Sequence, residues 1–77
     1  MEIRDRVRQT IAHELDVEAS GVSDEDSLEE LGAASAQLLE ITLAVEELFG
    51  IEVPDTALAR FRTVGDIVVF VEKRRSI

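Results

Sequence analysis

Apolar residues recur at three- and four-residue intervals along most of the chain, which is the spacing of one face of an α-helix. A first helix is predicted over residues 2–16, where four apolar residues lie four positions apart: Ile3, Val7, Ile11 and Leu15. A second helix is predicted to begin at Ser35. It is expected to end at Gly50, since glycine readily adopts the left-handed backbone conformation that ends helices.

The segments between these helices are less regular. Residues 51–54 are expected to be extended because they lead into a proline, and residues 55–61 are expected to form one or two helical turns. Residues 17–34 are rich in turn-forming and acidic residues, which predicts a long connection between the first two helices. Three apolar residues are expected to anchor that connection to the core: Val22, Leu28 and Leu31.

Two pairs of residues have the spacing of a capping box, in which each residue bonds the backbone N–H of the other. Ser27 and Glu30 predict a single turn inside the long connection. Thr63 and Asp66 predict the start of a last helix, whose basic C-terminal segment 73–75 complements the helix dipole. Four residues of this last helix are expected to face the core: Val64, Ile67, Val68 and Val71.

The predicted second helix is apolar on two sides. One set is expected to pack in the core: Leu38, Ile41, Thr42, Val45, Leu48 and Phe49. A second set lies on a different side and is interrupted by acids: Ala36, Leu39 and Leu43, with Glu40 and Glu47. A helix of this kind is either central in the core or presents one face to another protein, and the small size of the chain favours the second alternative.

Three long helices and one short helix predict an all-α fold, a small bundle. With 77 residues there is room for one hydrophobic core, so residues 1–77 are expected to form a single domain. A binding or carrier module is favoured over an enzyme for a chain of this size. The sequence has no cysteine and shows neither a signal peptide nor a transmembrane segment, which fits a protein of the reducing cytoplasm. The protein is expected to be a monomer.

Charge is distributed unevenly along the chain. The net charge is −9, and no lysine or arginine occurs between Arg8 and Arg60, an interval that holds thirteen acids. This acidic region is expected to repel nucleic acids and anionic membranes and to attract partners that carry basic patches.

Side chains for catalysis or metal binding are few. His13 is the only histidine and is remote in sequence from Ser35, so a serine–histidine–acid triad is not expected. The acids of residues 24–26 lack the pattern of a dedicated cation-binding loop, and Gly32 and Gly50 are too isolated to form a phosphate-binding loop. Ser35 is interpreted first as a helix N-cap, although the same position would also suit a phosphodiester.

The stretch LEELGAASAQLLEITLAVEELFGIEVPD, followed by TVGDI, resembles the acyl carrier protein family over nearly the whole chain. The resemblance implies a four-helix bundle that is a carrier and not an enzyme. It places 4′-phosphopantetheine on Ser35, transferred from coenzyme A by a separate phosphopantetheinyl transferase. The thiol of this group would hold acyl or aminoacyl thioesters for loading and processing enzymes. Those enzymes would dock on six residues: Ala36, Leu39, Glu40, Leu43, Glu46 and Glu47.

The chain also departs from the family pattern. Ala34-Ser35-Ala36 stands where relatives usually have Asp-Ser-Leu, and Gln37 is neutral where many carry an acid. These changes favour a specialised carrier with dedicated partners, or one that general transferases modify slowly. The alternative is a degenerate relative, an interaction module in which Ser35 is only a helix cap. Leu38 is expected to narrow any cavity between the second and third helices, which would favour a short or polar cargo.

Overall fold

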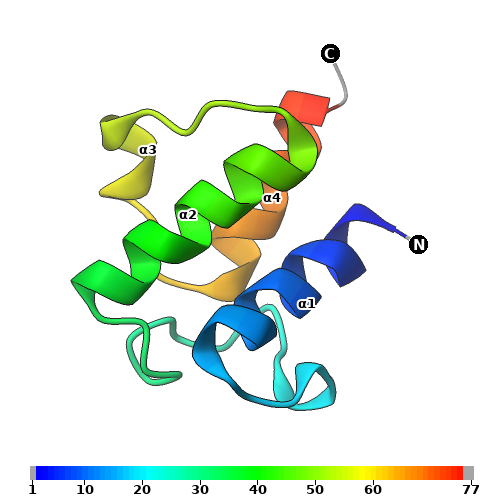
Figure 1. The fold of residues 1–77 in the computed structure, drawn as a ribbon, viewed down its shortest axis with the longest axis vertical. Helices are drawn as coiled ribbons and strands as arrows, with labels where there is room; N and C mark the ends of the chain where they lie inside the picture. Colours follow the sequence, from blue (N-terminus) through cyan, green and yellow to red (C-terminus); the bar gives the residue numbers. More distant parts are fainter. Residues whose placement is uncertain (1, 76–77) are drawn as a thin grey trace.

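The computed structural model describes residues 2–75, and the ordered elements of that region are helices (Figure 1). They are α1 (Ile3–Leu15), the 3₁₀ turn η1 (Ala19–Gly21), α2 (Ser35–Phe49), α3 (Asp55–Leu58) and α4 (Val64–Arg75). In Figure 1, α2 crosses the front of the molecule with α4 behind it, α1 on one side and α3 on the other. The predicted all-α fold of three long helices and one short helix is confirmed.

Local signals end the first two helices, and the second ends where the sequence predicts. Asp16 follows α1 with φ 56°, and its N–H donates to the carbonyl oxygens of Ala12 and His13. Gly50 follows α2 with φ 65°, and its N–H donates to the Glu46 carbonyl. Both residues take the left-handed conformation, which satisfies carbonyl groups that the last helical turn leaves unpaired.

The capping box of α4 forms in both directions. The Asp66 N–H donates to Thr63 Oγ1 at 3.2 Å, and the Thr63 N–H donates to Asp66 Oδ2 at 3.0 Å. The Arg62 N–H also donates to the same carboxylate at 2.9 Å. These backbone donors, Arg62 first and then Thr63, hold the pKa of Asp66 below its usual value.

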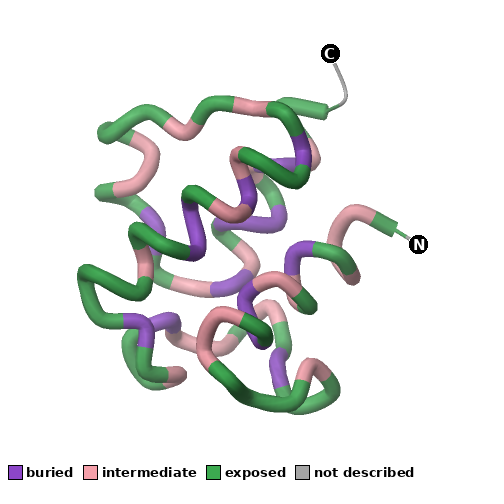
Figure 2. The backbone as a smooth tube through the Cα atoms, viewed as in Figure 1, coloured by how far each residue is buried: buried purple, intermediate pink, exposed green. Residues whose placement is uncertain are grey.

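One continuous core joins α1, α2 and α4, and the buried stretches of all three helices face inward in Figure 2. The predicted core residues of α4 are all buried, and so are four of the six predicted for α2. The buried members of α2 are Ile41, Thr42, Val45 and Phe49.

Leu48 was expected in the core, and that prediction is wrong: 45% of its surface is exposed. At 100° per residue, Leu48 lies roughly 75° around the helix from the middle of the buried face, while Phe49 lies near it. Phe49 therefore fills the core at this end of α2. Leu48 lies at a surface groove beside α1, together with Ala44 and His13.

The long connection 17–34 is fastened at several points. Val22 and Leu28 are buried and Leu31 is half-buried against the core, as expected for anchors. The Glu30 N–H donates to Ser27 Oγ at 3.3 Å, so half of the predicted capping box is present.

A backbone pairing that the sequence does not predict links this connection to the start of α4. The Leu28 N–H donates to the Arg62 carbonyl at 2.9 Å, and the Gly65 N–H donates to the Asp24 carbonyl at 2.8 Å. A Cβ on Gly65 would lie 3.1 Å from that Asp24 oxygen, so glycine permits the close approach. The pairing holds the connection against the start of α4.

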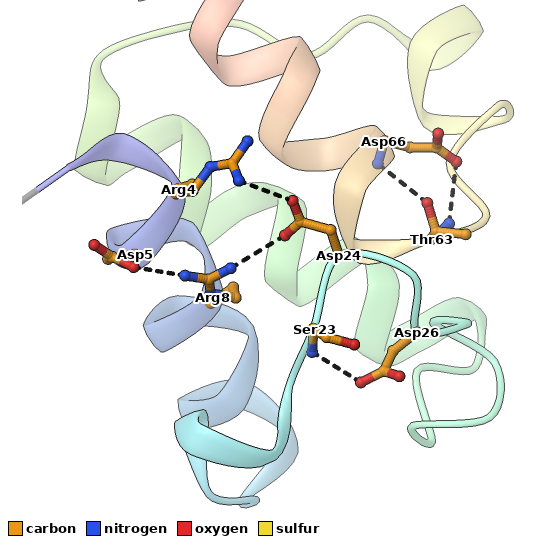
Figure 3. A network of polar contacts seen from close by, with 8 residues as sticks. All are labelled: Arg4, Asp5, Arg8, Ser23, Asp24, Asp26, Thr63 and Asp66. Carbon is orange, nitrogen blue, oxygen red and sulfur yellow. Dashed lines mark hydrogen bonds and ion pairs between the residues drawn. The ribbon is translucent and has the colours of Figure 1, made fainter.

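Ion pairs add a second fastening from α1 (Figure 3). The Asp24 carboxylate lies 3.4 Å from Arg4 Nη1 and 3.3 Å from Arg8 Nη1, and Arg8 also contacts Asp5 at 2.6 Å. These pairs are partly solvated, so each contributes little alone, but together they position the connection that leads to Ser35. In the described region, no helix has the length and apolar character needed to cross a membrane.

Candidate functional site at the start of α2

Ser35 is the first helical residue of α2 and is exposed. The prediction that Ser35 is the N-cap is wrong, because Ala34 occupies the cap position with an extended backbone, φ −68° and ψ 178°. A residue already inside the first turn cannot direct its hydroxyl to the N–H groups that a cap would bond. Among residues 2–75, the Ser35 hydroxyl has no hydrogen-bond partner.

The backbone before the serine holds it in place without help from its side chain. Gly32 has φ 98°, a conformation that glycine adopts without strain. The Ala33 N–H then donates to the Leu28 carbonyl at 2.9 Å, and the Ala34 N–H donates to the Gly32 carbonyl at 3.0 Å. Ala33 is buried, so this turn is anchored in the core while Ser35 remains accessible.

The start of α2 can accept an anion. The Leu38 N–H donates to the Ala34 carbonyl at 2.8 Å. Helix geometry therefore leaves the N–H groups of Ser35, Ala36 and Gln37 without an intrahelical acceptor. The first turn of α2 contains no acid, so the positive end of the helix dipole is not neutralised there. A phosphodiester on the Ser35 oxygen fits both the free hydroxyl and these unpaired donors.

Ser35 also borders an open groove of about 760 Å³. Its apolar lining comes from Leu28, Ala33, Leu38 and Phe61, and its polar lining includes Arg62 and Thr63. Leu38 is half-buried on this wall. The groove thus offers space beside the serine, and the expectation that Leu38 restricts the cargo stays a prediction.

The outer face of α2 lies opposite the core. Ala36, Glu40 and Glu47 are exposed, and Leu39 and Leu43 are 50% and 52% exposed. Two large apolar side chains therefore stand in solvent between acidic neighbours, an arrangement typical of a surface that is covered by a partner.

Glu46 differs from the other acids of α2. It is half-buried, and its Oε2 accepts a hydrogen bond of 2.7 Å from the Val53 N–H. The carboxylate therefore fastens the extended segment 51–54 to α2, a structural role that the sequence does not predict. The sequence contains only an indirect indication of this hydrogen bond: an acid lies three residues before the end of the helix, and the extended segment that follows has backbone N–H groups that need acceptors.

Other titratable groups do not converge on Ser35. His13 is exposed on α1 and lines a groove with Leu48, separate from the groove of Ser35. Of the acids in 24–26, Asp24 pairs with two arginines and Asp26 accepts the Ser23 N–H at 2.9 Å (Figure 3). Glu29 and Arg62 line the groove beside Ser35, but no titratable side chain among residues 2–75 hydrogen-bonds to the serine hydroxyl. The arrangement around Ser35 therefore provides an attachment point for a group.

Comparisons with known proteins agree with this geometry. The sequence model of the family described as "Phosphopantetheine attachment site" matches residues 5–71. The chain is 41% identical over 76 residues to the acyl carrier protein of Sinorhizobium fredii (strain NBRC 101917 / NGR234), and the match covers 97% of each chain. It is equally similar, over the same share of each chain, to the acyl carrier protein AcpP of Rhizobium meliloti (strain 1021). The chain therefore belongs to the acyl carrier protein family, whose members are carriers with covalently attached 4′-phosphopantetheine and not enzymes.

Proposed function

We propose that Ser35 carries the 4′-phosphopantetheine group and that the chain holds biosynthetic intermediates on it as thioesters. The observation that supports this assignment is the exposed Ser35 hydroxyl, which has no hydrogen-bond partner in the described chain and lies at the unpaired N–H groups of α2. The attached group supplies the thiol that forms the thioester, which a chain without cysteine cannot supply itself.

Attachment needs little from the carrier beyond access and charge stabilisation. A transferase removes the Ser35 hydroxyl proton, and the serine oxygen forms a new bond to the phosphorus on the pantetheine side of coenzyme A while the pyrophosphate linkage breaks and adenosine 3′,5′-bisphosphate leaves. The unpaired N–H groups at the start of α2 then stabilise the phosphodiester by about 0.3 to 1 kcal/mol. The buried turn at Ala33 keeps the oxygen in a fixed, accessible position.

The outer face of α2 is the surface that we assign to docking. Leu39 and Leu43 provide apolar contact, with Ala36 nearer to the serine. Glu40 and Glu47 provide negative charge for basic patches on the transferase and on loading and processing enzymes. Glu46 adds its charge from the edge of this face, since one of its oxygens is bonded to the Val53 N–H.

The residues beside Ser35 suggest a restricted range of cargo and partners. Leu38 occupies the wall of the groove, which favours a short or polar acyl or aminoacyl group. Ala34 and Ala36 lack the acid and the large apolar side chain that relatives commonly present, which favours dedicated partners. We further propose that the carrier acts as a cytoplasmic monomer.

The competing function is an interaction module in which Ser35 serves only as a helix cap. The cap geometry of α2 does not support it. Ala34 is the cap residue, and its own side chain makes no capping hydrogen bond. A serine whose only role was to cap α2 would stand one position earlier, at the cap position.

The assignment of Ser35 is tested by incubating the protein with coenzyme A and a phosphopantetheinyl transferase of broad specificity, followed by intact-mass measurement. Wild type and a Ser20→Ala control should gain one phosphopantetheine, because Ser20 is an exposed serine of η1 outside the site. Ser35→Ala should gain none. Equal modification of Ser35→Ala and wild type would overturn the assignment.

The same assay tests the departure at Ala34. Ala34→Asp restores an acid next to the serine, and we expect faster modification by a general transferase. An unchanged rate would show that the missing acid does not limit recognition.

A further inference from the structure

A second groove, of about 420 Å³, lies between α3 and α4 and shares only Phe61 with the groove beside Ser35. Its walls come from the start of α3, the segment after it and the outer side of α4. Ser35 and the outer face of α2 do not contribute to it.

The floor of this groove is apolar. The rings of Phe61 and Phe70 meet edge to face, with centroids 5.7 Å apart and an interplanar angle of 75°. Phe61 is buried, Phe70 is half-buried, and Val69 beside them is 47% exposed. An apolar side chain from a partner would therefore cover surface that is now in contact with water.

The rim of the groove is basic, although the chain as a whole is strongly acidic. Arg60, Lys73 and Arg74 line it, which is three of the eight basic residues of the chain. The Arg74 guanidinium lies 4.9 Å from the centroid of the Phe70 ring, so its charge is held over the apolar floor. The Asp66 carboxylate also borders the groove, and its Oδ2 already accepts hydrogen bonds from the N–H groups of Arg62 and Thr63.

We propose that this groove binds an acidic amphipathic segment of a partner protein. An apolar side chain of that segment packs on Val69 and Phe70, and its carboxylates pair with Arg60 and Arg74. Charge complementarity supports this occupant, because acids are the groups that a basic rim attracts. A nucleic acid or an anionic membrane fits less well, since their continuous negative charge would also face the acids of the rest of the chain.

The groove and the outer face of α2 select for opposite charges. A partner that has a basic patch for α2 and an acidic segment for α3 and α4 would fix the orientation of the carrier as well as bind it. A partner with basic patches alone would contact only the first surface. This second surface therefore adds specificity that the acidic helix cannot supply.

The test uses a fluorescein-labelled helical peptide that carries leucines on one face and glutamates on the other, with fluorescence anisotropy measured at low salt. We expect saturable binding to the full chain, reduced at high salt. The same peptide with lysine in place of glutamate should bind the acidic outer face of α2 instead, so its binding should not weaken in Arg74→Glu. Arg74→Glu should weaken binding about tenfold.

Arg6→Glu is the matched control. Arg6 also lies over a phenylalanine ring, 5.2 Å from the centroid of Phe49, but on α1 and outside the groove. Each substitution replaces +1 by −1 and so changes the net charge from −9 to −11. Thermal melting of both variants checks that the fold is kept.

Binding that is unchanged in Arg6→Glu and weakened in Arg74→Glu supports the groove. Equal weakening in both variants, no binding of the acidic peptide, or preferential binding of duplex DNA or anionic vesicles would overturn it. Ser35→Ala should bind the peptide as wild type does, so failure of this proposal and failure of the Ser35 assignment remain distinguishable.

Discussion

Replacing Ala36 by leucine should strengthen docking on α2 without altering the fold. Ala36 is exposed in the first turn of α2, next to Ser35 and on the face opposite the core. A larger side chain there meets solvent in the free protein, so the free energy of unfolding should change by less than about 0.5 kcal/mol. In a complex, the same side chain would add apolar contact beside Leu39.

The magnitude follows from the area that the substitution adds. Leucine has three more carbon atoms than alanine, and each buried CH₂ group contributes about 0.8 kcal/mol, so complete burial would add about 2.4 kcal/mol. Docking surfaces cover such side chains only in part. With half of the added area buried, the gain is about 1.2 kcal/mol, which corresponds to roughly an eightfold increase in affinity.

The assay measures kcat/KM for transfer of phosphopantetheine by a transferase of broad specificity, with wild type and Ala36→Leu as the carrier substrates. The gain should appear mainly in KM. Ala59→Leu is the matched control, because Ala59 is an exposed alanine after α3 and should leave kcat/KM unchanged. A value for Ala36→Leu equal to or below wild type, with the fold intact, would refute the assignment of this surface.

Three further predictions concern stability. Asp66→Ala should lose about 1 kcal/mol of unfolding free energy at pH 7, because the capping box of α4 is broken. The folded-state pKa of Asp66 is lowered, so its contribution is present above its unfolded pKa and is lost as the pH falls through the folded pKa. Urea unfolding should therefore show a gap between variant and wild type that narrows in acid, and a constant gap would contradict this. Glu46→Ala should cost about 1 kcal/mol by losing the bond from the Val53 N–H, whereas Glu46→Gln should keep most of it; equal losses would speak against this hydrogen bond. Raising the salt concentration should raise Tm by screening the repulsion among the acids, and a Tm that does not rise would count against a concentrated acidic surface.

Features that depend on nearby residues could be predicted from the sequence. The left-handed glycine that ends α2 and the capping box of Thr63 and Asp66 depend only on residues close together in sequence, and the structure contains both. The first helix was predicted over 2–16 and spans Ile3–Leu15, a difference confined to its ends. The helical turn predicted over 55–61 is shorter, Asp55–Leu58.

Features that depend on packing between distant segments could not be predicted in this way. Two examples are the backbone pairing of segment 24–28 with 62–65 and the hydrogen bond from the Val53 N–H to Glu46. No local sequence pattern indicates that these residues lie next to each other. Leu48 fits the helical period but lies at the margin of the buried face, and only the rotation of α2 against α1 decides its exposure.

The candidate site also combines a feature that the sequence predicts with features that depend on packing. The resemblance of the sequence to carriers predicts Ser35 as the attachment point, but the position of Ser35 within the first turn of α2 depends on the turn at Gly32 and the burial of Ala33. A cap at Ser35 was the simplest local interpretation. The structure moves the cap to Ala34 and leaves the serine hydroxyl accessible.

The most direct test of the central claim is peptide mapping by mass spectrometry of the protein purified from its native host. The account predicts that the peptide containing Ser35 carries one phosphopantetheine, free or acylated, and that fragment ions place it on the Ser35 oxygen. A chain that is entirely unmodified in growing cells, or one modified on Ser20, Ser23 or Ser27 instead, would contradict it.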